Sequence, residues 1–118
     1  MDQLKQEAIK SYFAELVESM DPLRVMDHLA KLLSLEDMEI IREPHSTYQE
    51  RNRKLISILC RKRETLEPFE RFVKALEKTD ANHEAMAKDI LSTYRKSQEF
   101  HFLMLTTLNT VCISLNNH

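Results

Sequence analysis

Few side chains in this sequence are spaced for catalysis or metal binding. Glu36 and Asp37 are adjacent, so on a helix their carboxylates would point about 100° apart instead of converging on one substrate. None of the histidines forms a pair four residues apart with a glutamate between them, the spacing of a zinc-binding helix. The chain contains no glycine, which excludes a glycine-rich phosphate-binding loop. We therefore expect no catalytic residue, cofactor-binding residue or metal site, and a protein that is not an enzyme.

The charged side chains are grouped by sign along the sequence, which favours a binding function. The sequence from Tyr48 to Arg63 predicts an amphipathic helix with an apolar face and, on another side, Lys54 and Arg61 at helical spacing, with Arg53 beside them. Acidic residues concentrate upstream. We predict two protein-interaction surfaces, one basic (Arg53, Lys54, Arg61) and one acidic (Asp27, Glu36, Asp37, Glu39). Two copies could dock basic surface on acidic surface, and such a heterologous contact can repeat into an open array.

A second hypothesis is a small helical nucleic-acid-binding or regulatory domain that uses the basic central helix. The net charge is -2, and the acidic segment would cancel much of the positive field over a Debye length of about 8 Å. No aromatic side chains alternate with the basic ones for base stacking. We therefore expect no nucleic-acid partner.

The elements that must position these residues are all helices. With 118 residues, 42% of them hydrophobic and 31% charged, the chain fits one globular domain, and the lack of glycine disfavours tight hairpins. Apolar spacing predicts helices over residues 4–20, 22–33, 35–42 and 48–63, a fifth that Thr65 caps, and a sixth that reaches Tyr94. Asp21, Ser34 and either Ser46 or Thr47 are the expected caps of the second, third and fourth helices. The expected fold is an all-α, six-helix antiparallel bundle whose core includes Leu55, Leu59, Phe72 and Leu76.

Four runs in this order resemble a caspase recruitment domain, a branch of the death-fold superfamily: Val25–Leu29, Leu35–Ile41, Arg53–Leu59 and Phe69–Leu76. The resemblance covers roughly residues 5–91, and the sixth helix lacks the Arg-x-Asp-Leu sequence of the related death-effector domains. It implies a Greek-key helix arrangement and an adaptor module that recruits or oligomerises with other caspase recruitment domain proteins. Such partners are caspases, adaptors or receptors in apoptotic, inflammasome or innate immune signalling. The family often has a glycine near the end of the fourth helix, where this chain has Lys62, Arg63 and Glu64.

The C-terminal segment differs in composition. We predict a death-fold domain over residues 1–94 and an apolar tail over residues 95–118 that has no charged side chain from Phe100 onward. Six tail residues fall at helical spacing, namely Met104, Leu105, Leu108, Val111, Cys112 and Leu115. We favour an extra C-terminal helix packed on the bundle, over a segment buried by a partner or one without selected structure. The apolar run is shorter than a span of about 20 residues, so we expect no membrane association. The first residues are polar, unlike a signal peptide, and the two cysteines lack the spacing of a metal or redox site. We therefore predict a cytoplasmic protein.

Overall fold

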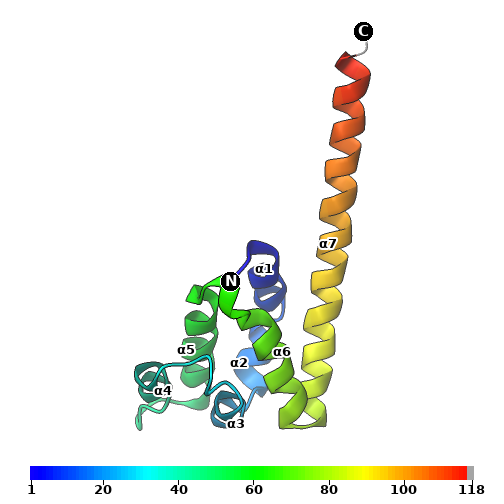
Figure 1. The fold of residues 1–118 in the computed structure, drawn as a ribbon. Helices are drawn as coiled ribbons and strands as arrows, with labels where there is room; N and C mark the ends of the chain where they lie inside the picture. Colours follow the sequence, from blue (N-terminus) through cyan, green and yellow to red (C-terminus); the bar gives the residue numbers. More distant parts are fainter. Residues whose placement is uncertain (117–118) are drawn as a thin grey trace.

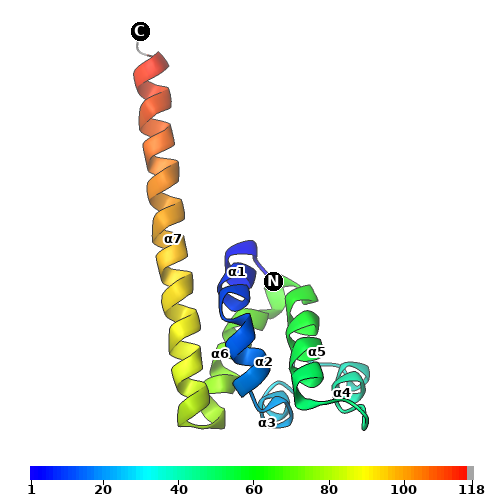
Figure 2. The same cartoon turned by 180° about the vertical axis from the view of Figure 1, so that it is seen from behind.

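The computed structural model describes the backbone of residues 1–116 and the side chains of residues 1–108. Its elements are α1 (Gln3–Ser11), α2 (Phe13–Ser19), α3 (Pro22–Asp27), α4 (Leu35–Ile41), α5 (Tyr48–Arg61), the 3₁₀ turn η1 (Glu64–Leu66), α6 (Pro68–Thr79) and α7 (Ala81–Asn116). Residues 1–116 contain no strand, which confirms the all-α prediction. Figures 1 and 2 show α1 to α6 gathered into a bundle, with α7 beginning against it and then extending well past it.

Three of the predicted helix caps are confirmed, those of α3, α4 and α5. Asp21 accepts a hydrogen bond from the Arg24 backbone N–H at 3.3 Å, and Pro22 occupies the first turn of α3. Ser34 and Asp37 form a reciprocal capping box at the start of α4. Thr47, rather than Ser46, caps α5 through the Glu50 N–H at 3.1 Å. These caps fix where the helices begin, because each supplies an acceptor to a backbone N–H that has no partner within its helix.

The first two predicted helices are too long. The chain breaks at Tyr12, whose φ of -112° lies outside the helical range, so residues 4–20 form α1 and α2 instead of one helix. The Tyr12 hydroxyl donates to the Asp89 carboxylate of α7 at 3.0 Å, a tertiary contact that accompanies the break. The second predicted helix ends at Asp27, because His28 and Leu29 make tight bonds to carbonyls three residues back and residues 28–33 continue as turns.

The connection from α5 to α6 also differs from the prediction. Thr65 lies inside η1 and caps nothing, whereas Glu67 precedes α6 with a left-handed φ of 54°. Pro68 is the first residue of α6, and a proline disfavours helical geometry in the residue before it, so α6 cannot begin earlier. Glu67 is the only described non-glycine residue with positive φ. The chain thus makes this turn without the glycine that the family pattern often supplies.

The predicted core is confirmed. Leu55, Leu59, Phe72 and Leu76 have no exposed area and belong to one cluster of buried side chains. This cluster joins the inner faces of α5 and α6, the two central amphipathic helices. Burial of apolar surface at this seam is therefore a main source of stability for the bundle.

Asn52 is the polar exception within the core. It is fully buried on α5, and its side-chain Nδ2 donates to the carbonyls of Leu16, Val17 and Met20 at 3.2, 2.9 and 2.9 Å. These carbonyls lie at the end of α2, where a helix has acceptors without internal partners. Asn52 therefore serves as a C-terminal cap for α2 supplied from another helix.

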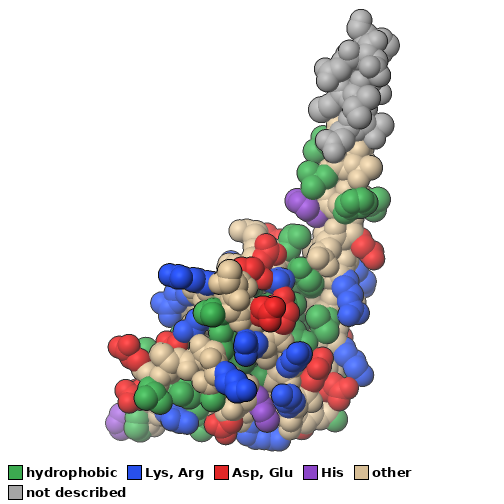
Figure 3. Space-filling model, in the orientation of Figure 1, with side chains coloured by type: hydrophobic (Ala, Val, Ile, Leu, Met, Phe, Trp, Pro, Cys, Tyr) green, Lys and Arg blue, Asp and Glu red, His purple; other side chains and the backbone are tan. Residues whose placement is uncertain are grey.

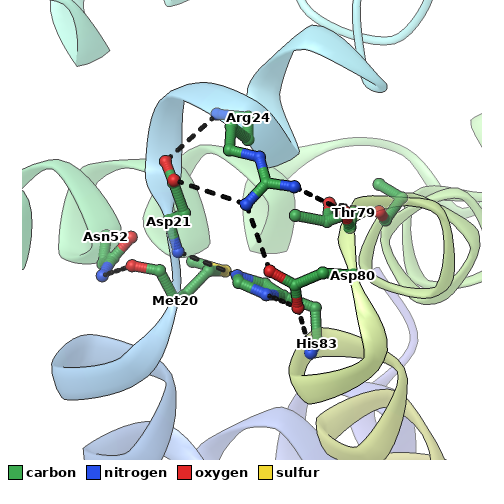
Figure 4. A network of polar contacts seen from close by, with 8 residues as sticks. Met20, Asp21, Arg24, Asn52, Thr79, Asp80 and His83 are labelled. Carbon is green, nitrogen blue, oxygen red and sulfur yellow. Dashed lines mark hydrogen bonds and ion pairs between the residues drawn. The ribbon is translucent and has the colours of Figure 1, made fainter.

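A network of polar contacts joins the α2–α3 corner to the α6–α7 corner (Figure 4). Arg24 donates to the Thr79 carbonyl at 2.6 Å and to the Asp80 carboxylate at 3.1 Å. The buried His83 ring accepts the Asp21 N–H at Nε2, so its Nδ1 carries the proton and donates to Asp80 at 2.7 Å. Hydrogen bonds from the backbone N–H and the ring of His83, together with Arg24, lower the pKa of Asp80 to about 2. The network holds the start of α7 in a fixed position on the bundle.

The predicted sixth and C-terminal helices form one continuous helix, α7. The expectation that residues from Phe100 onward pack on the bundle is wrong for the described side chains: Phe100 is 67% exposed and Leu108 is 55% exposed. Figure 3 shows hydrophobic side chains, without charged ones, on the described part of α7 that projects from the bundle. The side chains of Val111, Cys112 and Leu115 lie outside the described residues. No described helix is both long enough and apolar enough to span a lipid bilayer.

Candidate protein-interaction surface

The three predicted basic residues line one shallow groove between α4 and α5. Arg53, Lys54 and Arg61 of α5 share this groove with Ser57 and Ile58 of the same helix and with Ile40 of α4. The groove has a volume of about 250 Å³. Helical spacing brings the basic residues to one side of α5, as predicted, while Ile40 shows that α4 forms the opposite wall.

The three cations are held differently. Lys54 is half-buried, and its ammonium donates to the Ser46 hydroxyl at 2.8 Å and to the Ile40 carbonyl at 3.4 Å. Arg53 and Arg61 are exposed, and neither takes part in the ion pairs of the described chain. The two arginines are therefore free to bind a carboxylate from another molecule, whereas Lys54 is partly occupied within the domain.

The four predicted acidic residues do not form one continuous surface. Glu36 and Glu39 are exposed on α4, three residues apart and so on neighbouring parts of the helix. Asp27 ends α3 and lines a different groove of about 450 Å³, together with Lys31 and, from α6, Lys74 and Lys78. Of the four, Glu36 and Glu39 are thus the pair available beside the α4–α5 groove.

Asp37 is committed inside the domain. It completes the capping box with Ser34 and forms an ion pair with Lys62 at 2.7 Å, with only 19% of its side chain exposed. Partial burial would raise the pKa of Asp37, but the hydrogen bonds from Lys62 and Ser34 outweigh burial and lower the pKa below its usual value. This ion pair fastens the start of α4 to the end of α5.

Two exposed apolar residues of α4 were not among the predicted site residues. Leu35 is 77% exposed and Ile40 is 46% exposed, although both belong to a run whose other apolar members face the core. The sequence held a signal for Ile40: on a helix it points about 100° away from Ile41, which is fully buried. In the described part of the chain, no cluster of histidine, cysteine or acidic side chains could hold a metal ion.

Comparison with known proteins supports one family. The sequence-family model described as the caspase recruitment domain matches residues 1–93. The helical bundle of α1 to α6, closed by the first part of α7, agrees with the death fold of that family. A search of curated proteins found no relative that matches this chain. The part of α7 that projects from the bundle lies beyond the matched residues.

Proposed function

This chain belongs to the caspase recruitment domain family, and on that premise we propose that it recruits or oligomerises with other proteins of the family in apoptotic or inflammatory signalling. Members of the family are modules for homotypic protein–protein interaction. We place the protein in the cytoplasm, with caspases, adaptors or receptors of the same family as partners. It acts by binding and not by catalysis.

The observation that carries this proposal is the separation of unlike charges across α4 and α5. Arg53 and Arg61 sit unpaired along the groove, and Glu36 and Glu39 are exposed on the neighbouring helix. When a second domain approaches, its carboxylates can meet these arginines, and complementary charge speeds encounter and sets specificity. Basic and acidic surfaces are different patches, so the contact is heterologous and can extend into a linear or helical assembly.

Charge reversal tests the proposal. We expect Arg53→Glu combined with Arg61→Glu to abolish self-association, measured by light scattering, while circular dichroism shows the fold intact. Exposed charges contribute at most about 1 kcal/mol to stability, so the fold should tolerate the change. The pair Glu36→Lys and Glu39→Lys should abolish association from the other side, and an equimolar mixture of the two variants should associate again.

The matched control reverses Arg95 and Lys96, two exposed residues of α7, to glutamate. That variant changes the net charge by the same amount as the arginine pair but leaves the groove intact, so it should associate like the unmodified chain. Asp37 is left unchanged because its reversal would break the Lys62 ion pair and the cap of α4. Unchanged association of both folded reversal pairs would refute charge-directed docking.

A further inference from the structure

The acidic side of α4 carries an exposed apolar side chain. Leu35, the first residue of α4, is the most exposed large hydrophobic residue in the described chain at 77%. Glu36 follows it directly, and Glu39 lies one helical turn later on the same side, about 40° away. A protruding leucine beside two carboxylates, here called the Leu35 knob (Leu35, Glu36, Glu39), offers apolar area that a binding partner would bury.

The α4–α5 groove has the complementary composition. Ile40, 46% exposed, supplies apolar surface on one wall, and the buried Ile58 forms part of the floor beside Lys54 and Arg61. Its volume of about 250 Å³ is below the range of about 300–1,000 Å³ typical of small-molecule sites. The groove therefore suits an apolar side chain with carboxylates beside it better than a soluble ligand.

We propose that the Leu35 knob of one copy inserts into the α4–α5 groove of a second copy, where Glu36 and Glu39 meet Arg53 and Arg61. This inference rests on the proposed homotypic docking and names its apolar anchor. Exposed ion pairs alone contribute little to affinity, whereas a buried apolar anchor surrounded by polar contacts is the usual arrangement of a binding hot spot.

The apolar centres of the two halves point in different directions, although Glu36 lies within about 40° of Ile40 around the helix. Leu35 and Ile40 are five residues apart on α4, so their side chains diverge by about 140° around the helix axis. A molecule cannot place its own Leu35 in its own groove, and a molecule whose knob is bound still offers a free groove. The second copy is the favoured occupant because one chain presents both an acidic apolar knob and a basic apolar groove. The contact then repeats in an open array.

Serine substitutions separate the apolar anchor from the charges. Leu35→Ser and Ile40→Ser each leave the net charge unchanged, and Leu23→Ser on α3 is the matched control, since Leu23 is also exposed, at 38%. Sedimentation velocity over a concentration series measures the dissociation constant of self-association. We expect this constant to be at least about tenfold higher for the first two variants, as for loss of a hot-spot residue. The control should match the unmodified chain, and circular dichroism should be the same for all four proteins.

Mixing the variants gives the sharper test. Leu35→Ser keeps an intact groove and Ile40→Ser keeps an intact knob, so an equimolar mixture should form one-to-one complexes that do not grow further. If both serine variants associate like the unmodified chain while the charge-reversal variants do not, the apolar anchor is refuted and charge-directed docking survives. If the charge-reversal variants also associate normally, or if the unmodified chain stays monomeric, both ideas fail.

Discussion

Replacement of Asn52 should lower the stability of the bundle more than is usual for a polar residue. The side chain is fully buried on α5, and its Nδ2 is shared among the carbonyls of Leu16, Val17 and Met20. In Asn52→Ala, the Leu16 carbonyl keeps the Met20 N–H at 3.0 Å, but the Val17 and Met20 carbonyls lose their Asn52 donor. The change therefore leaves buried acceptors at the end of α2 without the amide that satisfies them.

The magnitude follows from those two carbonyls. A buried acceptor left unsatisfied costs about 1–3 kcal/mol, so two give about 2–6 kcal/mol. Part of this is offset, because Asn52 Oδ1 is itself buried without a partner in the native chain and disappears in the variant. We expect Asn52→Ala to lower the free energy of unfolding by about 3 kcal/mol, a large share of the stability of a small domain.

Urea denaturation at pH 7, followed by circular dichroism, measures this change. Ser57→Ala, an exposed position on the same helix, is the control and should stay within about 0.5 kcal/mol of the native protein. Asn52→Asp keeps the shape of the side chain but points an oxygen at three carbonyl oxygens, so it should be less stable than Asn52→Ala. A cost below about 1 kcal/mol for Asn52→Ala, or native stability for Asn52→Asp, would refute the capping role.

Four further predictions use the same denaturation measurement. Leu59→Ala should cost about 2–5 kcal/mol, as for a buried leucine, and a cost below about 1 kcal/mol would contradict its place in the core. Asp37→Ala should cost about 1–2 kcal/mol through loss of the α4 cap and the Lys62 ion pair, and a neutral result would contradict the capping box. Glu67→Gly should stabilise the domain by about 1 kcal/mol because glycine adopts a positive φ without strain, whereas destabilisation would place Glu67 outside the left-handed region. The Asp80 carboxylate, with its pKa lowered from 3.8 to about 2, stabilises the fold above pH 4 and loses that effect as the pH falls toward 2, so Asp80→Asn should weaken the acid dependence of stability in that interval.

Local signals in the sequence predicted the features that depend on a few neighbouring residues. A cap is a hydrogen bond across three residues, so Asp21, Ser34 and Thr47 mark helix starts wherever the rest of the chain lies. Apolar spacing likewise predicted the buried faces of α5 and α6. For the same reason, the placement of Arg53, Lys54 and Arg61 along one groove follows from the turn of a single helix.

Features that depend on distant residues could not be predicted in this way. The break at Tyr12 coincides with a hydrogen bond to Asp89, 77 positions away, and no glycine or proline marks it. From the sequence alone, Asp37 is indistinguishable from a free surface carboxylate. Its ion pair with Lys62 forms only because α4 packs against the end of α5. In the sequence, Asp27 groups with Glu36 and Glu39. Only the packing of α3 against α6 places Asp27 in another groove.

Because α7 is one continuous helix, the direction of each of its side chains is fixed relative to the bundle. The 36 residues of α7, at about 1.5 Å each, span about 54 Å. The hydrogen bonds of His83 with Asp21 and of Asp80 with Arg24 hold its first turn on the bundle. The direction in which Phe100 points around the helix axis is therefore set by the corner between α6 and α7. Inserting one residue after Arg95 would swing Phe100 by about 100° and advance it about 1.5 Å, whereas four residues would swing it only about 40° and advance it about 6 Å.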